Sequence, residues 1–404
     1  MDTGTAGAAV VTGMGAVTPL GVGAGLLYKR WCAGDSGLAD GAGRCTGFNP
    51  GEYLSRRELR TTDRFTQLSV AAADEALTQA GWSRGDLPYP SGRIGCVIAS
   101  SMGGLYSLFR NFERYQVSPQ RMSPFTVVMY MPNAAAAMIA ARWGLRGESC
   151  AVVAACASGT FALGTARRML AEDCVDAVVV GGADAAVMDE VLQAFTVMGA
   201  LSPSGVPRPF DRARDGFVLG EGAGALVLER GDAAAGRGAA VLGEVIGFGA
   251  STDAHDMSAP DPTGAAAAAA ISRALHSASV TPADLSYVNA HGTGSHHNDA
   301  AETQALKTAL GEHAYRVPVS STKSAIGHLM GGAGTVEAIA TLLALSEGVV
   351  PPTLGLADPD DGLDLDYVPG TARPMPERPG RGRVAISNSF GLGGNNAVVA
   401  LRGA

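Results

Sequence analysis

The sequence has few cysteines, few aromatic residues and no excess of basic charge. Its six cysteines include no CxxC pair, and their irregular spacing matches neither a disulfide framework nor a zinc site. The net charge of −8 disfavours non-specific attraction to nucleic acid or to an anionic membrane. No basic region precedes an apolar one near the N-terminus. We therefore expect a cytoplasmic protein in a reducing compartment, with no nucleic-acid or membrane partner.

One uncharged segment is long enough to span a bilayer. Residues 122–141 carry no charge, but they include Pro124, Pro132 and Asn133. A buried helix or a contact between subunits is the better interpretation. The 55 glycines, scattered without a period, fit a chain with many tight turns between strands and helices.

Short β-branched runs alternate with alanine-rich stretches of helical length. This alternation predicts a layered α/β fold with a largely parallel, buried sheet. A change in pattern near residues 235–250 predicts a division of the chain there. The expected strands are residues 8–12, 94–99, 150–154, 177–180, 223–228, 241–246, 287–290, 317–320 and 384–387.

Two motifs resemble ligand sites but lack the required spacing. Residues 13–18 begin like a dinucleotide-binding fingerprint, yet Thr18 and Pro19 stand where the last glycine and the helix should be. His296 and His297 are adjacent, without the spacing of a zinc motif. They are expected to form a polar loop before a helix over residues 300–310, and no metal site is predicted.

Cys156 follows a buried strand and precedes a segment of helical period. A cysteine at a helix N-terminus has a lowered pKa when backbone N–H groups and the helix dipole stabilise the thiolate, which makes it a nucleophile. The alternative is a buried structural cysteine, and the segment alone does not decide between the two.

Two histidines in loops rich in small residues favour the catalytic interpretation. His291 ends a strand within residues 289–295, and His328 lies in the glycine-rich segment 320–334. Together with Cys156 they form the set that cysteine-based acyl transfer requires. The glycines of residues 387–396 could bring backbone N–H groups close to a developing oxyanion.

On these segments, together with 11–15, 208–211 and 215–224, the chain resembles the β-ketoacyl-acyl carrier protein synthases, in particular the type II elongating ketosynthases of the thiolase superfamily. The resemblance extends over nearly the whole chain. It implies a thiolase-like five-layered αβαβα sandwich built from two pseudo-symmetric halves, each with a mixed five-stranded sheet. The halves are expected at residues 1–245, with the nucleophile, and 246–404, with the two histidines; together they form one catalytic unit.

The resemblance also implies roles for individual residues. Cys156 would be the acylated nucleophile, and His291 and His328 the two family histidines. Lys323 would support the site electrostatically and Glu337 would act behind it, although both could instead be scaffold residues. The oxyanion hole would consist of the backbone N–H groups of Cys156 and Leu392, and the pantetheine and acyl substrate would contact Thr293, Ser295, Phe390 and Met102.

The chain departs from the family pattern at the acyl entrance. Leu392 stands where relatives have a second phenylalanine, and Asp256 replaces a histidine of the opposing loop. These differences predict an altered acyl selectivity. Met102 matches the bottom of the acyl pocket, with core packing as the alternative.

The resemblance implies that an acidic carrier protein docks on a basic segment. Arg57, Arg60 and Arg64 have spacings of three and four residues, which predicts one helical face. Glu58 and Asp63 interrupt the segment, and Thr61 replaces a commonly basic residue, so an ordinary solvated face is the alternative.

The implied function is decarboxylative Claisen condensation of an acyl chain on Cys156 with malonyl-acyl carrier protein. No cofactor is expected beyond the carrier's phosphopantetheine. A role in a type II polyketide or specialised fatty-acid pathway is favoured over a role in housekeeping fatty-acid elongation. The same fold could also serve as a chain-length subunit or as a C–O bond-forming acyltransferase. The enzyme would be a homodimer, or a heterodimer with a ketosynthase-like chain-length subunit.

Overall fold

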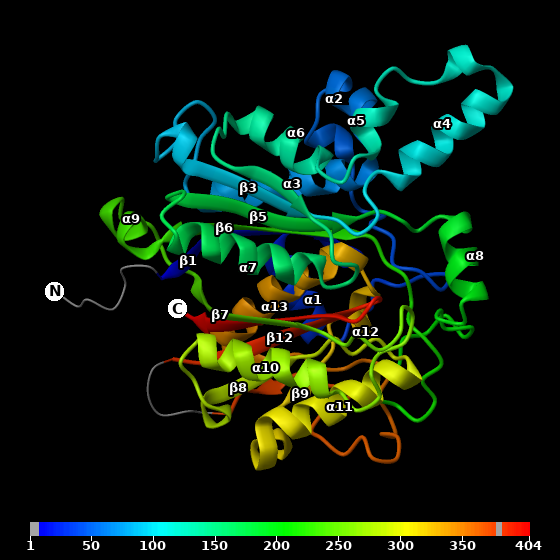
Figure 1. Ribbon diagram of the computed structural model, residues 1–404, viewed down its shortest axis with the longest axis vertical. Helices are drawn as coiled ribbons and strands as arrows, with labels where there is room; N and C mark the ends of the chain where they lie inside the picture. Colours follow the sequence, from blue (N-terminus) through cyan, green and yellow to red (C-terminus); the bar gives the residue numbers. More distant parts are fainter. Residues whose placement is uncertain (1–7, 377–381) are drawn as a thin grey trace.

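A computed structural model describes residues 8–376 and 382–404. Its main strands form two sheets (Figure 1), and the order of the strands across the first sheet, counted along its half of the chain, is repeated in the second. Residues 1–7, part of the stretch searched for an export signal, lie outside the described residues. The first sheet has the order β4 (Ser149–Val152), β3 (Ile94–Ala99), β5 (Ala177–Asp184), β6 (Gly222–Arg230) and β1 (Ala9–Thr18). The second has the order β9 (Val319–Ser320), β8 (Leu285–Asn289), β12 (Val384–Gly391), β13 (Asn395–Gly403) and β7 (Gly243–Thr252).

Both sheets are mixed, and their strand directions also repeat. Strands β4, β3 and β5 are parallel, as are β9, β8 and β12. The other pairs are antiparallel, and β1 also pairs with β7, which joins the two sheets. The predicted largely parallel sheet is therefore wrong for about half of the structure, because the apolar pattern of a buried strand does not encode its direction.

Helices separate and cover the two sheets. Helices α3 (Arg64–Gln79) and α6 (Ala134–Trp143) cover the outer face of the first sheet, and α10 (Ala265–Ser277) and α11 (His296–Leu310) that of the second (Figure 1). Between the sheets lie α7 (Ser158–Ala171) and α13 (Ala333–Glu347). This arrangement confirms the predicted five-layered αβαβα sandwich. The division after residue 245 stays a prediction, and β7 extends across that position.

Close packing explains the glycines of β1. A Cβ atom on Gly13 would lie 1.9 Å from the carbonyl oxygen of Ala76, and one on Gly15 would lie 2.1 Å from that of Ala72. Only glycine lets α3 pack directly on this strand. Residues 13–18 thus continue the strand that was expected to end at residue 12, and they form no dinucleotide-binding turn.

The uncharged segment 122–141 forms α5 (Thr126–Tyr130) and most of α6, separated near Pro132. Within the described residues, no helix is long and apolar enough to cross a membrane. The remaining elements are β2 (Gly21–Val22), α1 (Ala24–Cys32), α2 (Arg56–Thr61), α4 (Leu105–Val117), α8 (Asp189–Val197), α9 (Gly231–Gly236), α12 (Lys323–Ile326), β10 (Val349–Val350), β11 (Arg373–Pro374) and short 3-10 turns.

Candidate active site

Cys156 lies in a sharp bend between β4 and α7. Ala155 adopts a left-handed conformation with φ of 48°. The hydroxyl of Ser158 stabilises the bend, because it accepts a hydrogen bond from the N–H of Ala154 at 2.8 Å and donates one to the carbonyl of Ala155 at 2.6 Å. The strand therefore ends and the helix begins within a few residues, with Cys156 at the helix N-terminus and 6% exposed.

Burial dominates the acidity of Cys156. It raises the pKa of the thiol to about 11, although the backbone N–H groups of Leu392 and Cys156 and the charge of Lys323 act in the opposite direction. The predicted lowering of this pKa is therefore wrong in its net direction. The cost of desolvating a thiolate exceeds the stabilisation that the N–H groups and the helix dipole provide. At neutral pH the side chain is a thiol.

The imidazoles of His291 and His328 face each other. Their ring centroids are 5.4 Å apart and the rings are nearly perpendicular, at 85°. Both side chains are buried, and burial together with the positive charge of Lys323 holds the pKa of each imidazole well below its usual range. Both histidines are consequently neutral at physiological pH.

Backbone contacts fix the loops that carry these histidines. The Nδ1 atom of His328 accepts a hydrogen bond from the N–H of Met330 at 3.2 Å, so in the neutral ring Nε2 carries the proton. The carboxylate of Glu302 accepts the N–H groups of His291 at 2.8 Å and Gly292 at 2.7 Å. Glu302 therefore helps to fix the loop around His291.

A buried ion pair lies behind the histidines. The Nζ atom of Lys323, at the start of α12, contacts Oε1 of Glu337 on α13, and both side chains are almost fully buried. Burial raises the pKa of Glu337 while Lys323 lowers it. The charge of Lys323 acts on Cys156, His291 and His328, which makes it the shared cation of the site.

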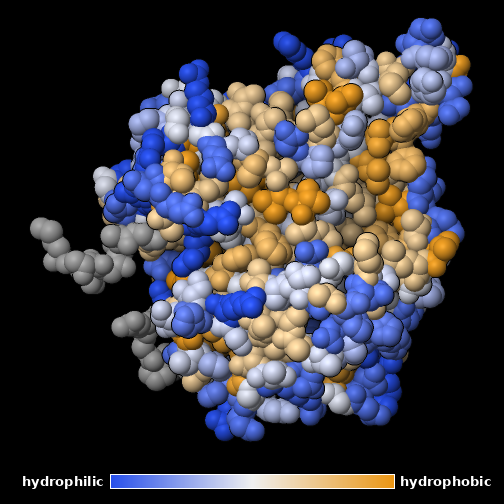
Figure 2. All heavy atoms as spheres, viewed as in Figure 1, coloured by the Kyte–Doolittle hydropathy of each residue, from blue (hydrophilic) through white to orange (hydrophobic). Residues whose placement is uncertain are grey.

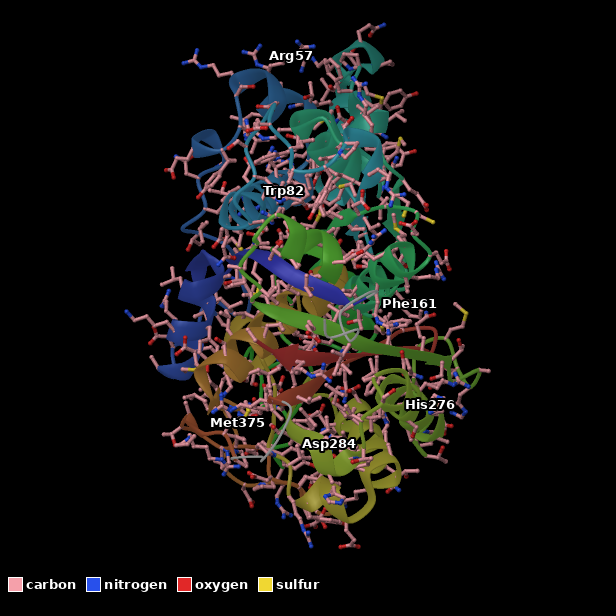
Figure 3. The ribbon with its side chains drawn as sticks, turned by 90° about the vertical axis from the view of Figure 1, so that its left-hand side faces the viewer. Arg57, Trp82, Phe161, His276, Asp284 and Met375 are labelled. Atoms are coloured by element: carbon pink, nitrogen blue, oxygen red, sulfur yellow. The ribbon has the colours of Figure 1, made fainter. Side chains whose placement is uncertain are left out.

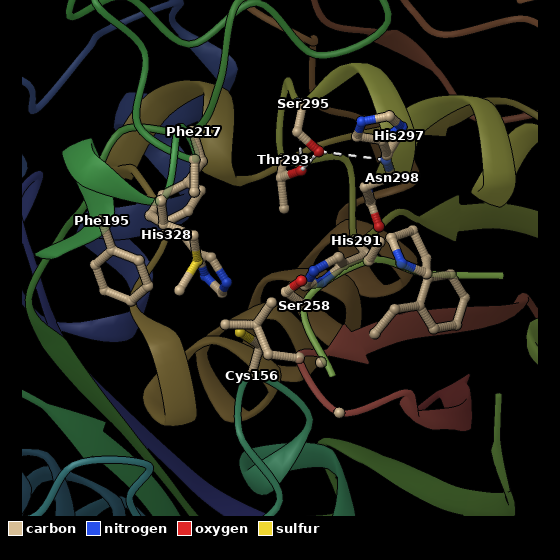
Figure 4. A pocket seen from close by; sticks show the side chains of 18 of the residues that line it. Cys156, Phe195, Phe217, Ser258, His291, Thr293, Ser295, His297, Asn298 and His328 are labelled. Atoms are coloured by element: carbon tan, nitrogen blue, oxygen red, sulfur yellow. Dashed lines mark hydrogen bonds between the residues drawn. The ribbon is translucent and has the colours of Figure 1, made fainter. Parts of the chain in front are cut away.

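A cavity of about 340 Å³ opens over Cys156, His291 and His328 (Figure 4). Met102 does not line it and instead packs in the apolar cluster that includes Cys156, Val191 and Phe195. The predicted site residues that line the cavity are Cys156, His291, His328, Thr293, Ser295, Phe390 and Leu392.

His297 and Asn298 also line the cavity, which the sequence did not predict. Helix α11 begins at His296 rather than near residue 300, so both residues belong to its first turn and not to a loop. Ser295 was the residue in the sequence that could have indicated this helix start. Its hydroxyl caps the helix by accepting a hydrogen bond from the N–H of Asn298 at 3.3 Å. Phe195 and Met198 come from α8 and its C-terminal end, and no local pattern connects them with the site.

The altered residues of the acyl entrance lie on two hydrogen-bonded loops. The N–H of Gly393 donates to the carbonyl of Met257 at 2.9 Å, and that of Asp253 to Gly394 at 2.9 Å. Asp256 does not line the cavity; its carboxylate accepts the N–H of Ser258 at 2.8 Å and thereby shapes the loop.

The basic segment is divided between two helices. Arg57 and Arg60 lie on α2, which is outside the cavity; both are exposed, and neither forms an ion pair with a described residue. Arg64 begins α3 and forms a bidentate pair with Glu221, at 2.6 and 2.7 Å. The predicted single face is therefore wrong for Arg64, because an extended Thr62 and the N-cap Asp63 interrupt the helix.

Solved ketosynthases have the same fold. The ishigamide ketosynthase/chain length factor matches with a TM-score of 0.90 and 31% identity, covering 98% of this chain and 99% of that one. A β-ketoacyl synthase from Burkholderia phymatum matches with a TM-score of 0.89 and 32% identity, at the same coverage. This fold, together with a cysteine that faces paired histidines, defines the class of the protein. It is a thiolase-type condensing acyltransferase.

Sequence comparisons specify the family. The N-terminal domain of β-ketoacyl synthases matches residues 48–234, and the C-terminal domain matches residues 242–357. The 3-oxoacyl-[acyl-carrier-protein] synthase 2 of Synechocystis sp. is 40% identical over 97% of both chains, and that of Vibrio harveyi 39% over 97% of this chain and 98% of its own. The chain belongs to the β-ketoacyl-acyl carrier protein synthases, condensing enzymes that are acyltransferases.

Proposed function

We propose that Cys156, His291 and His328 elongate an acyl chain in two half-reactions. In the first, the sulfur of Cys156 attacks an acyl thioester of the carrier, and the thiol proton passes to the departing pantetheine sulfur. In the second, a malonyl thioester loses CO₂ and its enolate attacks the acyl group on Cys156. The 3-oxoacyl chain leaves on the carrier, and the Cys156 thiolate takes a proton from solvent.

Neutral, paired imidazoles are the observation that carries this proposal. Decarboxylation leaves negative charge on the malonyl thioester oxygen, which N–H donors can stabilise without protonating the carbanion. His328 has the required donor, because its Nδ1 accepts from Met330 and its Nε2 carries the proton. The imidazole of His291 also lines the cavity, and its buried Nδ1 atom has no hydrogen-bond partner among the described residues.

The remaining site residues have supporting roles. The N–H groups of Cys156 and Leu392, which act on the sulfur, would form the oxyanion hole for the attacked acyl carbonyl. Lys323, paired with Glu337, would keep both imidazoles neutral. The hydroxyls of Thr293 and Ser295 line the cavity 3.1 Å apart and would bind the amides of the pantetheine arm.

We propose a type II polyketide pathway as the setting, with housekeeping fatty-acid elongation as the alternative. Structural relatives include a type II polyketide acyl-carrier protein in complex with its ketosynthase bound to a hexaketide, and a ketosynthase in complex with its chain length factor. Leu392, a slimmer side chain than the usual phenylalanine, would admit polar or unsaturated chains more readily. The 40% identity to a 3-oxoacyl-[acyl-carrier-protein] synthase 2 favours the alternative.

A second ketosynthase-fold chain would cover the apolar face near β4. Strand β4 is an edge strand, and α4 and α5 expose Phe112, Tyr115, Val127 and Val128, which are 46–58% exposed. Figure 2 shows apolar side chains gathered over these two helices. Large apolar patches of this kind mark interfaces between proteins. Mass measurement of the native complex distinguishes a homodimer from a heterodimer with a chain-length subunit, and a monomer contradicts both.

The carrier protein would dock through α2. The exposed guanidinium groups of Arg57 and Arg60, which form no ion pair with a described residue, would attract an acidic partner. Figure 3 shows Arg57 at the outer end of the molecule. A capping box of Ser55 and Glu58 and the ion pair of Glu58 with Arg142 at 2.7 Å fix the orientation of this short helix.

Intact-protein mass spectrometry tests the function and the substrate class together. The chain is incubated with carrier proteins loaded with saturated, polar or unsaturated acyl groups, and the mass added to it is measured. We expect polar or unsaturated groups to load faster, no added mass on Cys156→Ala, and wild-type loading on Cys174→Ala, which removes an exposed cysteine. Equal loading of saturated medium chains would contradict the polyketide setting, and acyl mass on Cys156→Ala would overturn the nucleophile.

A Leu392→Phe variant isolates the acyl entrance. Restoring the aromatic side chain should shift the loading preference towards saturated chains while the backbone N–H of residue 392 stays in place. An unchanged preference would mean that Leu392 does not determine acyl selectivity.

A further inference from the structure

Asp184, the last residue of β5, is a fully buried carboxylate without an ion-pair partner among the described residues. Its Oδ1 atom accepts hydrogen bonds from Ser100 Oγ at 2.6 Å and from the N–H of Met102 at 3.1 Å. Its Oδ2 atom accepts from the N–H and Oγ of Ser101, at 3.0 and 2.6 Å, and from the N–H of Gly331 at 2.7 Å. Five donors thus satisfy a charge that would otherwise be costly to bury.

These donors come from two segments that are distant in the sequence. Residues 100–102 follow β3, whereas Gly331 belongs to the 3-10 turn Met330–Gly332 that follows His328. A Cβ atom on Gly331 would lie 2.5 Å from the nitrogen of Ser101 and 2.8 Å from Oδ2 of Asp184. The turn can approach the carboxylate this closely only because residue 331 is glycine.

The same turn orients the imidazole of His328. The N–H of Met330 donates to Nδ1 of His328 at 3.2 Å, and the N–H of the next residue, Gly331, donates to Asp184. The carboxylate therefore fixes the peptide group next to the one that sets the tautomer of His328. Asp184 lies at the end of β5, so this contact joins the first sheet to the loop that carries His328.

We propose that Asp184 is a positioning residue for condensation, which acts by holding the Met330–Gly332 turn so that Nε2–H of His328 is directed at the substrate. The proposal rests on the proposed function of His328. It predicts that loss of Asp184 matters only while the imidazole of His328 is present. Cys156 and its bend use no hydrogen bond from Asp184. Besides burial, the negative charge of Asp184 raises the pKa of the Cys156 thiol, so loss of the carboxylate should not slow acylation.

A double-mutant cycle of Asp184→Ala and His328→Ala tests this coupling, with condensation and Cys156 acylation measured separately by mass spectrometry. Removing one donor to an oxyanion typically slows a reaction by about 100- to 1000-fold. Asp184→Ala should slow condensation by about 100-fold through kcat, leave acylation within about threefold, and add no further loss in the His328→Ala background.

Two further variants keep the test decisive if Asp184→Ala folds poorly. Asp184→Asn keeps the shape of the side chain, and with its amide oxygen at the Oδ2 position it still accepts from Gly331; it should lose about tenfold in condensation, and only while His328 is present. Ser101→Ala is the matched control, because it removes one hydroxyl donor to Asp184 and retains the N–H of Gly331, so condensation should stay within about threefold of wild type.

Additive losses in the double variants, or an equal loss of acylation, would overturn the positioning role. Near-wild-type condensation by both Asp184 variants would do the same. A His328→Ala variant that still condenses at the wild-type rate would instead refute the proposed function of His328 itself, so the two failures are distinguishable.

Discussion

Replacement of His328 by Gln should slow condensation less than replacement by Asn or Ala. All three variants should leave acylation of Cys156 intact. The order follows from the hydrogen bond between Nδ1 and the N–H of Met330, which leaves the proton on Nε2. Glutamine is one carbon longer than asparagine, so its amide N–H reaches the Nε2 position. The amide of asparagine reaches only the Nδ1 position, where Met330 already presents a donor.

The magnitudes follow from the number of donors lost. Loss of one donor to an oxyanion raises the barrier by about 2.7–4 kcal/mol, so Ala and Asn should condense about 100- to 1000-fold more slowly. Gln should lose about tenfold, or about 1.4 kcal/mol, because its donor is less rigid. Since burial keeps the pKa of His328 far below its usual range, the order should not change across neutral pH.

The assay follows condensation of acyl-Cys156 with malonyl-carrier under single-turnover conditions, after the acyl-enzyme has been verified by mass. His255→Gln, which alters an exposed histidine outside the cavity lining, is the matched control and should react like wild type. Faster condensation by Asn than by Gln would refute the tautomer argument. A loss below about tenfold for Ala would refute the donor role of His328.

Four further outcomes are expected. Because burial raises the pKa of Cys156 to about 11, its alkylation by iodoacetamide should accelerate about tenfold per pH unit through pH 9, and a plateau below pH 8 would contradict this. The folded chain keeps both buried histidines, His291 and His328, neutral, so the unfolded chain binds more protons below its His pKa of about 6.5. The free energy of unfolding should therefore fall as the pH drops below that value. Replacing either histidine by Ala should reduce the slope by about 1.4 kcal/mol per pH unit in urea titrations. Charge reversal at Arg57 and Arg60 should raise KM for acyl-carrier protein and leave KM for a small pantetheine thioester unchanged. Charge reversal at Arg168, which forms an exposed ion pair at the end of α7 that is far from Cys156, should change neither KM value. Glu337→Gln should destabilise the fold by about 3–5 kcal/mol, because it leaves Lys323 charged and unpaired, and the double variant Lys323→Met with Glu337→Leu should recover much of this loss in thermal unfolding.

The local sequence pattern predicted most of the strands, and the family resemblance implied the five layers. The local pattern did not give the strand directions or several element ends. Strand β13 has an apolar run, Ala397 to Leu401, that was not recognised, and it pairs with β12 through the short turn at Leu392. The start of α11 was misplaced because adjacent histidines suggested a loop. The side chain of Ser295 decided the boundary instead, by capping the helix.

Local sequence signals were enough to predict which residues take part in acyl transfer. Cys156 after a buried strand, and His291 and His328 in glycine-rich loops, are local chemical signals, and the family resemblance placed them in one reaction. Their neutrality could not be read in the same way, because the pKa of a buried group depends on neighbours from other elements. The expected low pKa of Cys156 failed for that reason.

How these residues are held depends on contacts between distant parts of the fold. It brings Lys323 close enough to act on three side chains, assigns Arg64 to Glu221 rather than to a docking surface, and joins Asp184 to the turn after His328 across 147 sequence positions. Such contacts leave no periodic trace in the sequence. A hydrogen bond depends on where two folded segments meet, whereas helix and strand patterns record only which faces are buried.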